Sequence, residues 1–137
     1  MSATSFWVAG VPVQQGSMKA FVAGGKARVV HTNPTGLNAW RDAIATEARA
    51  RFTTVTEGRV RVDLDFRMVR PKSLPKLKYK PHIKAPDIDK LARAGLDSLT
   101  GVVYIDDKQV DTLTVMKRYA EPEEQPGVKI TVWRDDE

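Results

Sequence analysis

RVRVDLDFRM, residues 59–68, decides the class of fold because its residues alternate strictly between charged and apolar. Successive side chains of a β-strand point to opposite faces, so the apolar set would lie on one face and the arginines and aspartates on the other. We therefore predict a strand that buries one face against a core. The apolar positions are Val60, Val62, Leu64, Phe66 and Met68.

Upstream of this strand the pattern changes to a helical period. After the Asn33-Pro34 pair, apolar residues recur at spacings of three and four, which is typical of one amphipathic helix. Residues 16–32 read as two short strands around Gly24-Gly25, a hairpin, and residues 6–13 begin with strand-forming residues. The helical apolar positions are Leu37, Trp40, Ile44, Ala48 and Phe52.

Downstream, four prolines between residues 70 and 86 exclude both a helix and a central strand, so we predict a long, mobile loop there. A second helix is expected from Ile88 to Leu99, with Gly101 as its stop signal. VVYI (102–105) reads as a short strand, and residues 109–119 and 128–133 as two more. Together, these expected strands and helices predict one α+β domain over residues 1–137, with a mixed sheet of about five or six strands and two main helices.

Composition excludes several functional classes. The chain has 137 residues, 42% of them hydrophobic, and no cysteine, so disulfides, thiolate nucleophiles and cysteine-ligated metals are ruled out. His31 and His82 stand far apart, and we interpret both as surface or DNA-facing residues. Without a long apolar run or the basic start and apolar core of a signal peptide, we expect a cytoplasmic protein with no membrane partner.

The net charge of the chain is +5, and the positive charge is concentrated in one segment. RPKSLPKLKYKPHIKAP, residues 70–86, carries six lysines or arginines and no acid. Such a segment repels itself and favours a polyanionic partner. A loop of this length without secondary structure is usually functional or disordered, and because this one is strongly basic we interpret it as a binding segment.

Two pairs of acids follow this basic loop. Asp87 and Asp89 stand at the start of the second helix, where capping is the simpler interpretation from spacing alone. Asp106 and Asp107 lie between two apolar stretches, where a tight turn also selects aspartate. If the chain brings both pairs together, however, they form a carboxylate cluster of the kind that a hard divalent cation requires.

Other acids are weaker candidates. Asp63 and Asp65 share a strand face with arginines, which favours cross-paired charges over a metal site. Asp97 and Asp111 are interpreted as surface acids.

PDIDKLARAGLDSLTGVVYIDDKQV, residues 86–110, resembles the RusA family of Holliday-junction resolvases. The signature of that family combines an Asp-x-Asp helix start, a Leu-Asp-Ala-Leu-like turn and an Asp-Asp-x-Gln-Val. VPVQQGSMKAF (11–21), the helix near Trp40 and the 59–68 strand with RPK fall in the same order. The resemblance implies a RusA-like fold and a small homodimeric endonuclease, common in phages. Such an enzyme depends on Mg2+, with Mn2+ as a substitute, and nicks symmetric strands of a four-way DNA junction in recombination and repair.

Carried over by position, the catalytic and metal-binding acids of the family fall on Asp87, Asp89 and Asp107. An essential lysine of the family aligns with Arg93, and its usual asparagine aligns with Lys90, so both positions depart from the pattern. Either cation can supply the missing charge from the same helix. The simpler interpretation of Arg93 is an i,i+4 ion pair with Asp89.

The basic loop then has a role that needs no base recognition, because its cations can bind phosphates. Two other functions stay open: a branched-DNA nuclease that also accepts flaps and forks, and a non-catalytic DNA-binding module whose acids are only caps and turn residues. The candidate phosphate contacts are Arg70, Lys72, Lys76, Lys78, Lys80 and Lys84.

Overall fold

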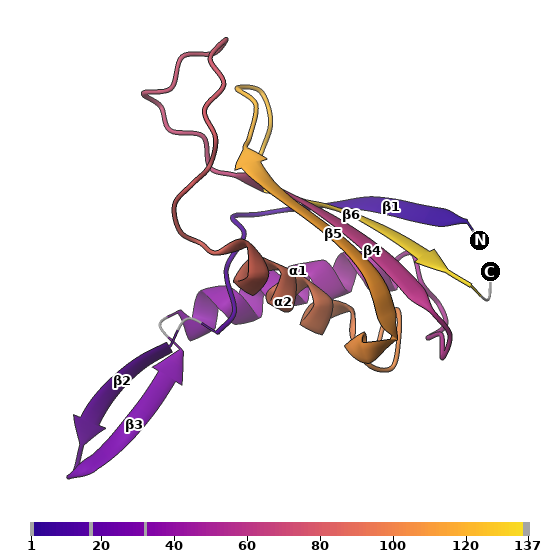
Figure 1. The fold of residues 1–137 in the computed structure, drawn as a ribbon, viewed down its shortest axis with the longest axis horizontal. Coiled ribbons are helices and arrows are strands. Elements are labelled where there is room, and N and C mark those ends of the chain that lie inside the picture. The colour runs from indigo at the N-terminus through magenta and orange to yellow at the C-terminus, as the bar shows by residue number, and fades with distance from the viewer. Residues whose placement is uncertain (1, 17, 32, 136–137) are drawn as a thin grey trace.

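A four-stranded mixed sheet forms the centre of the computed structural model, which describes residues 2–16, 18–31 and 33–135 (Figure 1). Two helices pack on this sheet, and a separate two-stranded hairpin extends from the body. The elements are β1 (Ala3–Ala9), β2 (Met18–Ala23), β3 (Lys26–His31), α1 (Pro34–Arg49), β4 (Val60–Met68), α2 (Ile88–Leu99), the short 3-10 helix η1 (Asp107–Gln109), β5 (Val110–Tyr119) and β6 (Gly127–Arg134).

The strand order in the main sheet is β1-β6-β4-β5. β4 pairs antiparallel with β6 and parallel with β5, so the stretch that alternates most clearly in sequence occupies an interior position. Its apolar residues are at most 4% exposed, and its charged residues are half-buried on the opposite face. The predicted strand, its two faces and the α+β class are confirmed.

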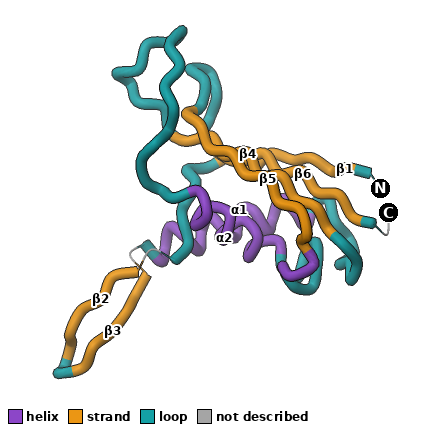
Figure 2. Tube along the Cα trace, viewed as in Figure 1, coloured by secondary structure: helices purple, strands orange, loops and turns teal. Residues whose placement is uncertain are grey.

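The sequence predicts a sheet of about five or six strands, and the structure divides its six strands between the four-stranded main sheet and a separate two-stranded sheet. β2 and β3 pair only with each other, around the turn at Gly24 and Gly25, whose φ angles of 59° and 75° are left-handed. The hairpin itself is confirmed, but Figure 2 shows it projecting from the body, far from the main sheet.

The VVYI segment is a turn and not a strand; Val102, Val103 and Tyr104 are buried, and Ile105 is exposed. Val103 donates to the Leu99 carbonyl at 2.9 Å and Gly101 donates to the Tyr104 carbonyl at 2.7 Å, while the Val103 carbonyl accepts the N–H of Thr56 at 3.0 Å in an isolated bridge. Tyr104 is fully buried, and its hydroxyl donates to the Leu96 carbonyl at 2.6 Å. Burial raises the pKa of this phenol well above its ordinary value. The apolar run therefore fills the core beneath α2 without joining a ladder.

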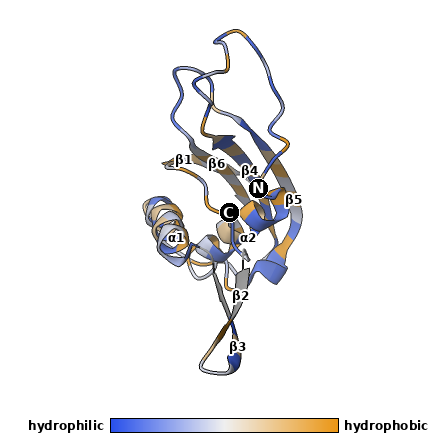
Figure 3. Ribbon diagram, turned by 90° about the vertical axis from the view of Figure 1, so that its left-hand side faces the viewer, coloured by the Kyte–Doolittle hydropathy of each residue, from blue (hydrophilic) through white to orange (hydrophobic). Residues whose placement is uncertain are grey.

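Both helices lie on the same side of the main sheet (Figure 3). Asn33 caps the start of α1, and its side chain accepts the N–H of Gly36 at 3.1 Å. α2 lies close to β4, and a Cβ on Gly95 would be 3.2 Å from a methyl carbon of Leu64. Glycine at this position therefore allows the middle of α2 to pack closely on β4. Within the described ranges, no helix is both long and apolar enough to cross a bilayer.

Candidate active site and DNA-binding loop

Asp87 occupies the N-cap position of α2, but its side chain makes no capping hydrogen bond. The carboxylate is 61% exposed and lies 3.6 Å from the ammonium of Lys90, one turn along the helix. The side chain of Asp87 therefore does not cap the helix, contrary to the simpler interpretation of its position. Lys90 is placed beside Asp87 as a counter-charge.

The later pair of acids divides into two roles. Asp106 caps the short helix η1, accepting the N–H of Lys108 at 2.9 Å, and the side chain of Gln109 accepts the N–H of Asp106 at 3.0 Å. Gln109 also donates to the carbonyls of Thr56 and Gly58 at 3.0 and 2.8 Å. Asp106 is thus a structural residue of the turn, and the side chain of Asp107 takes no part in this capping arrangement.

Asp107 lines a cavity of about 420 Å³ between α2 and β5, together with Asp89 and Arg93. Chain segments 18 residues apart therefore bring two of the three predicted acids, and one of the two predicted cations, to one surface. The rest of the lining is apolar, and consists of Ile88, Ala92, Leu96, Leu113 and Val115.

Asp87 lies outside the lining of this cavity, although its neighbour Ile88 belongs to it. Among the described residues, no group of three or more histidine, aspartate or glutamate side chains stands close enough to hold one metal ion. The donor pair Asp89 and Asp107 nevertheless fits a small hard cation, because Mg2+ is usually held by one or two carboxylates, with waters and substrate phosphate completing its coordination. The predicted roles of all three acids stay predictions.

The rival acids on β4 are committed to ion pairs. Asp65 lies 2.7 Å from the guanidinium of Arg67, which also contacts Glu124, and Asp63 lies 3.5 Å from Arg61. The hydrogen bonds that Arg67 donates to Asp65 raise the pKa of Arg67 above its ordinary value, although partial burial opposes this shift. The interpretation of this face as cross-paired charges is confirmed.

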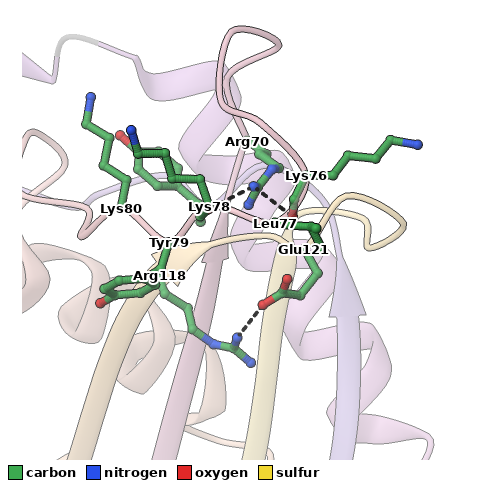
Figure 4. Close-up of a pocket in the computed structure, with 9 residues that line it drawn as sticks. Arg70, Lys76, Leu77, Lys78, Tyr79, Lys80, Arg118 and Glu121 are labelled. Carbon is green, nitrogen blue, oxygen red and sulfur yellow. Dashed lines mark hydrogen bonds and ion pairs between the residues drawn. The ribbon is translucent and has the colours of Figure 1, made fainter.

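Arg70 organises the basic loop from within. Its guanidinium donates to the carbonyls of Pro75 at 2.6 Å and Lys78 at 3.1 Å, and to that of Ala120 at 3.3 Å. Figure 4 shows this guanidinium turned into the loop, while Lys76 and Lys80 extend away from it. Arg70 therefore joins the two ends of residues 70–78 and ties them to the end of β5, and its predicted contact with phosphate stays a prediction.

The loop lysines are all exposed, as a phosphate-binding surface requires. Three large apolar side chains among them are also exposed, with Leu77, Tyr79 and Ile83 at 102%, 79% and 86%. Such apolar groups beside cations can contact unstacked bases. The exposed lysines are Lys72, Lys76, Lys78, Lys80 and Lys84.

His82 was predicted to be a surface residue, and this was wrong. It is 8% exposed, and its ring packs edge-on against Tyr119 with 4.8 Å between centroids. Loss of hydration lowers the pKa of the imidazole, and Lys117 and Lys84 lower it further. His82 anchors the loop to β5, and its position in a lysine- and proline-rich segment of the sequence gave no sign of burial. The side chain of His31 lies outside the described residues.

Three residues near the helix start were not found by sequence reasoning. Gln14 accepts the N–H of Asp87 at 3.2 Å, the N–H of Gln15 donates to the Lys90 carbonyl at 3.0 Å, and Lys117 donates to the Pro86 carbonyl at 2.8 Å. Neutral glutamines before a hairpin and a lysine within a strand carry no motif of their own. The only available signal was that VPVQQG fell within the resemblance quoted above.

Comparison with known proteins places this arrangement in a family. A protein of Bacillus subtilis (strain 168), named "Uncharacterized protein YqaN", is 29% identical over 143 residues, which span 96% of each chain. Residues 10–133 match the family described as "Endodeoxyribonuclease RusA", a span that includes both acid pairs, the basic loop and all of the main sheet except β1 and the last residue of β6. Enzymes of this family act on branched DNA and depend on a divalent metal ion. This chain belongs to the RusA family of endodeoxyribonucleases, the Holliday-junction resolvases.

Proposed function

We propose that this protein is a Mg2+-dependent resolvase that cuts four-way DNA junctions by paired, symmetric nicks in recombination and repair. The observation that carries the proposal is the shared cavity of Asp89, Asp107 and Arg93, which sets two carboxylates beside a cation in an otherwise basic protein. We place its action in the cytoplasm of a bacterium or of a phage-infected host.

Asp89 and Asp107, which line the cavity, would hold the ion, and Asp87, the N-cap residue of α2 just outside the lining, would add the third carboxylate. The bound ion would activate the attacking water and stabilise negative charge on the phosphate. Mn2+ would substitute for Mg2+, since both prefer oxygen ligands. Hydrolysis would break the bond between phosphorus and the 3′ oxygen, leaving a 5′-phosphate and a 3′-hydroxyl.

The cations of α2 would have different tasks. Arg93 lines the cavity and can stabilise charge on the phosphate oxygens as the reaction proceeds. A guanidinium supplies charge and hydrogen bonds in a fixed planar geometry, and we assign it no role in proton transfer. Lys90 lies beside Asp87 and would restrain that carboxylate until a metal ion competes for it.

The basic loop would hold the arms of the junction through phosphates, without reading sequence. A four-way junction has two-fold symmetry, so two sites on a symmetric homodimer would match the paired scissile bonds. Each nick would then come from one subunit.

The test is cleavage of a labelled synthetic four-way junction with Mg2+, with Mn2+ and with EDTA, beside fork, flap and duplex controls, using Asp87→Asn as the blank. We expect paired, metal-dependent nicks restricted to the junction and absent in the variant. Equal cutting of the flap or fork would establish a broader branched-DNA nuclease. Binding without any cleavage would establish a DNA-binding module.

A further inference from the structure

The peptide group between Pro86 and Asp87 is held at both of its polar ends by side chains from distant parts of the chain. Lys117 of β5 donates from Nζ to the Pro86 carbonyl at 2.8 Å, and Gln14 accepts the N–H of Asp87 at 3.2 Å. Because a peptide group is planar, fixing its C=O and N–H together fixes the orientation of the plane. The direction in which the side chain of Asp87 leaves the backbone follows from that orientation.

Lys117 holds more than this one peptide group. Its Nζ also donates to the Lys84 carbonyl at 2.7 Å, so a single half-buried ammonium joins two carbonyls at the end of the basic loop. An ammonium has three donors, and two of them are engaged with main-chain oxygens here. Lys117 is therefore bound to the backbone that leads into α2, and a direct contact with phosphate would have to use the remaining donor.

The connection after β1 lies along the other side of the same helix start. Gln15 donates its N–H to the Lys90 carbonyl at 3.0 Å, and its side-chain amide donates to Asp97. Gly16 has a left-handed φ of 86°, and a Cβ there would be 3.0 Å from the guanidinium of Arg93. The start of α2 is thus contacted by residues 14–16 and by Lys117 of β5.

Such support is needed because α2 begins without a side-chain cap, directly after the 70–86 loop. The first N–H groups of a helix have no partners within it, and an end without a cap frays. Ligands for a metal ion must be held to within about 0.5 Å to work together. Something outside the helix must therefore fix the turn that carries Asp87 and Asp89.

We propose that Lys117 and Gln14 are positioning residues for catalysis: they clamp the Pro86–Asp87 peptide and thereby orient the carboxylates of Asp87 and Asp89 for the metal ion. The proposal rests on the proposed nuclease function. It assigns Lys117 to the backbone and not to DNA.

The first test compares Lys117→Met, which removes the donors, with Lys117→Arg, which restores two of them, in the full-length protein. Lys129→Met, at an exposed lysine on β6, is the matched control. We expect Lys117→Met to lower kcat for junction cleavage by about 10- to 100-fold, since small misplacements have such effects. KM should change by less than about threefold, and the Mg2+ concentration for half-maximal rate should rise. Lys117→Arg should recover most of the rate, and Lys129→Met should leave it unchanged.

A different outcome would overturn the proposal. If Lys117→Met leaves kcat unchanged, weakens junction binding and reduces its salt dependence by about one phosphate contact, Lys117 binds DNA and does not position the acids.

The second test does not depend on cleavage. Amide hydrogen exchange at Asp87, measured in the parent, Lys117→Met and Gln14→Met proteins, reports the clamp directly, because the Asp87 N–H is one of its two bonds. We expect faster exchange at Asp87 in both variants, with melting temperatures close to that of the parent. Unchanged exchange would reject the clamp whatever the activity. A parent protein that cuts no junction would instead reject the proposed function, while the exchange rates still decide whether the clamp exists.

Discussion

Asp106 and Gln109 hydrogen-bond across a single turn, each accepting main-chain N–H groups at the other end of that turn. Asp107 lies between them, and its side chain lines the cavity opposite α2. The two adjacent aspartates therefore have different roles. Asp106 closes the turn by accepting main-chain hydrogen bonds, and Asp107 points its side chain to the cavity. This separation agrees with the assignment of the second acid as the candidate ligand.

Substitutions at the two aspartates should consequently have opposite effects. Asp106→Ala should lower the free energy of unfolding by about 1 kcal/mol, the usual loss for an N-cap, while cleavage is retained once the protein is folded. Asp107→Asn should abolish cleavage with little change in stability. Denaturant unfolding and junction cleavage on both variants give the comparison, and full activity in Asp107→Asn would remove this acid from the site.

The sequence predicted those parts of the molecule that follow local rules. The alternation of residues 59–68 and the apolar period of Ile88–Leu99 specify one buried face each, so β4 and α2 were found with nearly correct bounds. VVYI was misassigned because a short apolar run fits a turn as well as a strand, and the two are told apart by backbone hydrogen bonds, which here form turns and an isolated bridge but no ladder.

For the candidate site, the sequence likewise predicted which residues take part but not how their side chains are bonded. Residue type and resemblance identified the acids, but the division of labour between Asp106 and Asp107 depends on which side chain meets a main-chain N–H. The clamp from Lys117 and Gln14 joins segments about 100 residues apart, through main-chain atoms that carry no sequence signal. Arg70 was predicted as a phosphate contact because charge was visible in the sequence and its carbonyl partners were not.

Arg70 provides a prediction about the order of the basic loop. Arg70→Ala removes the donors that join Pro75 and Lys78 to the end of β5, so residues 71–80 should open more often. Limited trypsin digestion should then cut after Lys76 and Lys78 several-fold faster than in the parent. Lys72→Ala, which removes one charge from the same loop, is the control. Equal digestion of the two variants would show that charge, and not the carbonyl contacts, sets the order of the loop.

His82 provides a prediction about pH. Its pKa is lowered in the folded protein by burial and by Lys117, below the value of about 6.5 expected when unfolded. The unfolded chain therefore binds more protons between these two pKa values, so stability is complete above about pH 6.5 and is lost as the pH falls through that interval. Denaturant unfolding at pH 7.5 and pH 5.5 should show a smaller loss in His82→Phe than in the parent. An equal loss would assign the pH dependence to other groups.

The exposed lysines of the loop determine how binding should respond to salt. Each phosphate contact contributes about 0.9 to the slope of log affinity against log salt concentration. The triple variant Lys76→Ala, Lys78→Ala, Lys80→Ala should therefore lower that slope by between about 2 and 3, by similar amounts on a junction and on a duplex, because phosphates carry no sequence or branch information. The variant should keep its metal-dependent cleavage at saturating protein, since the cavity of Asp89 and Asp107 is untouched.

Electrophoretic mobility shifts over a range of salt concentrations give the slopes, with Arg49→Ala on α1 as a surface-charge control. An unchanged slope in the triple variant would move the DNA contact away from the loop, and a slope lowered on the junction alone would mean that these lysines read its shape.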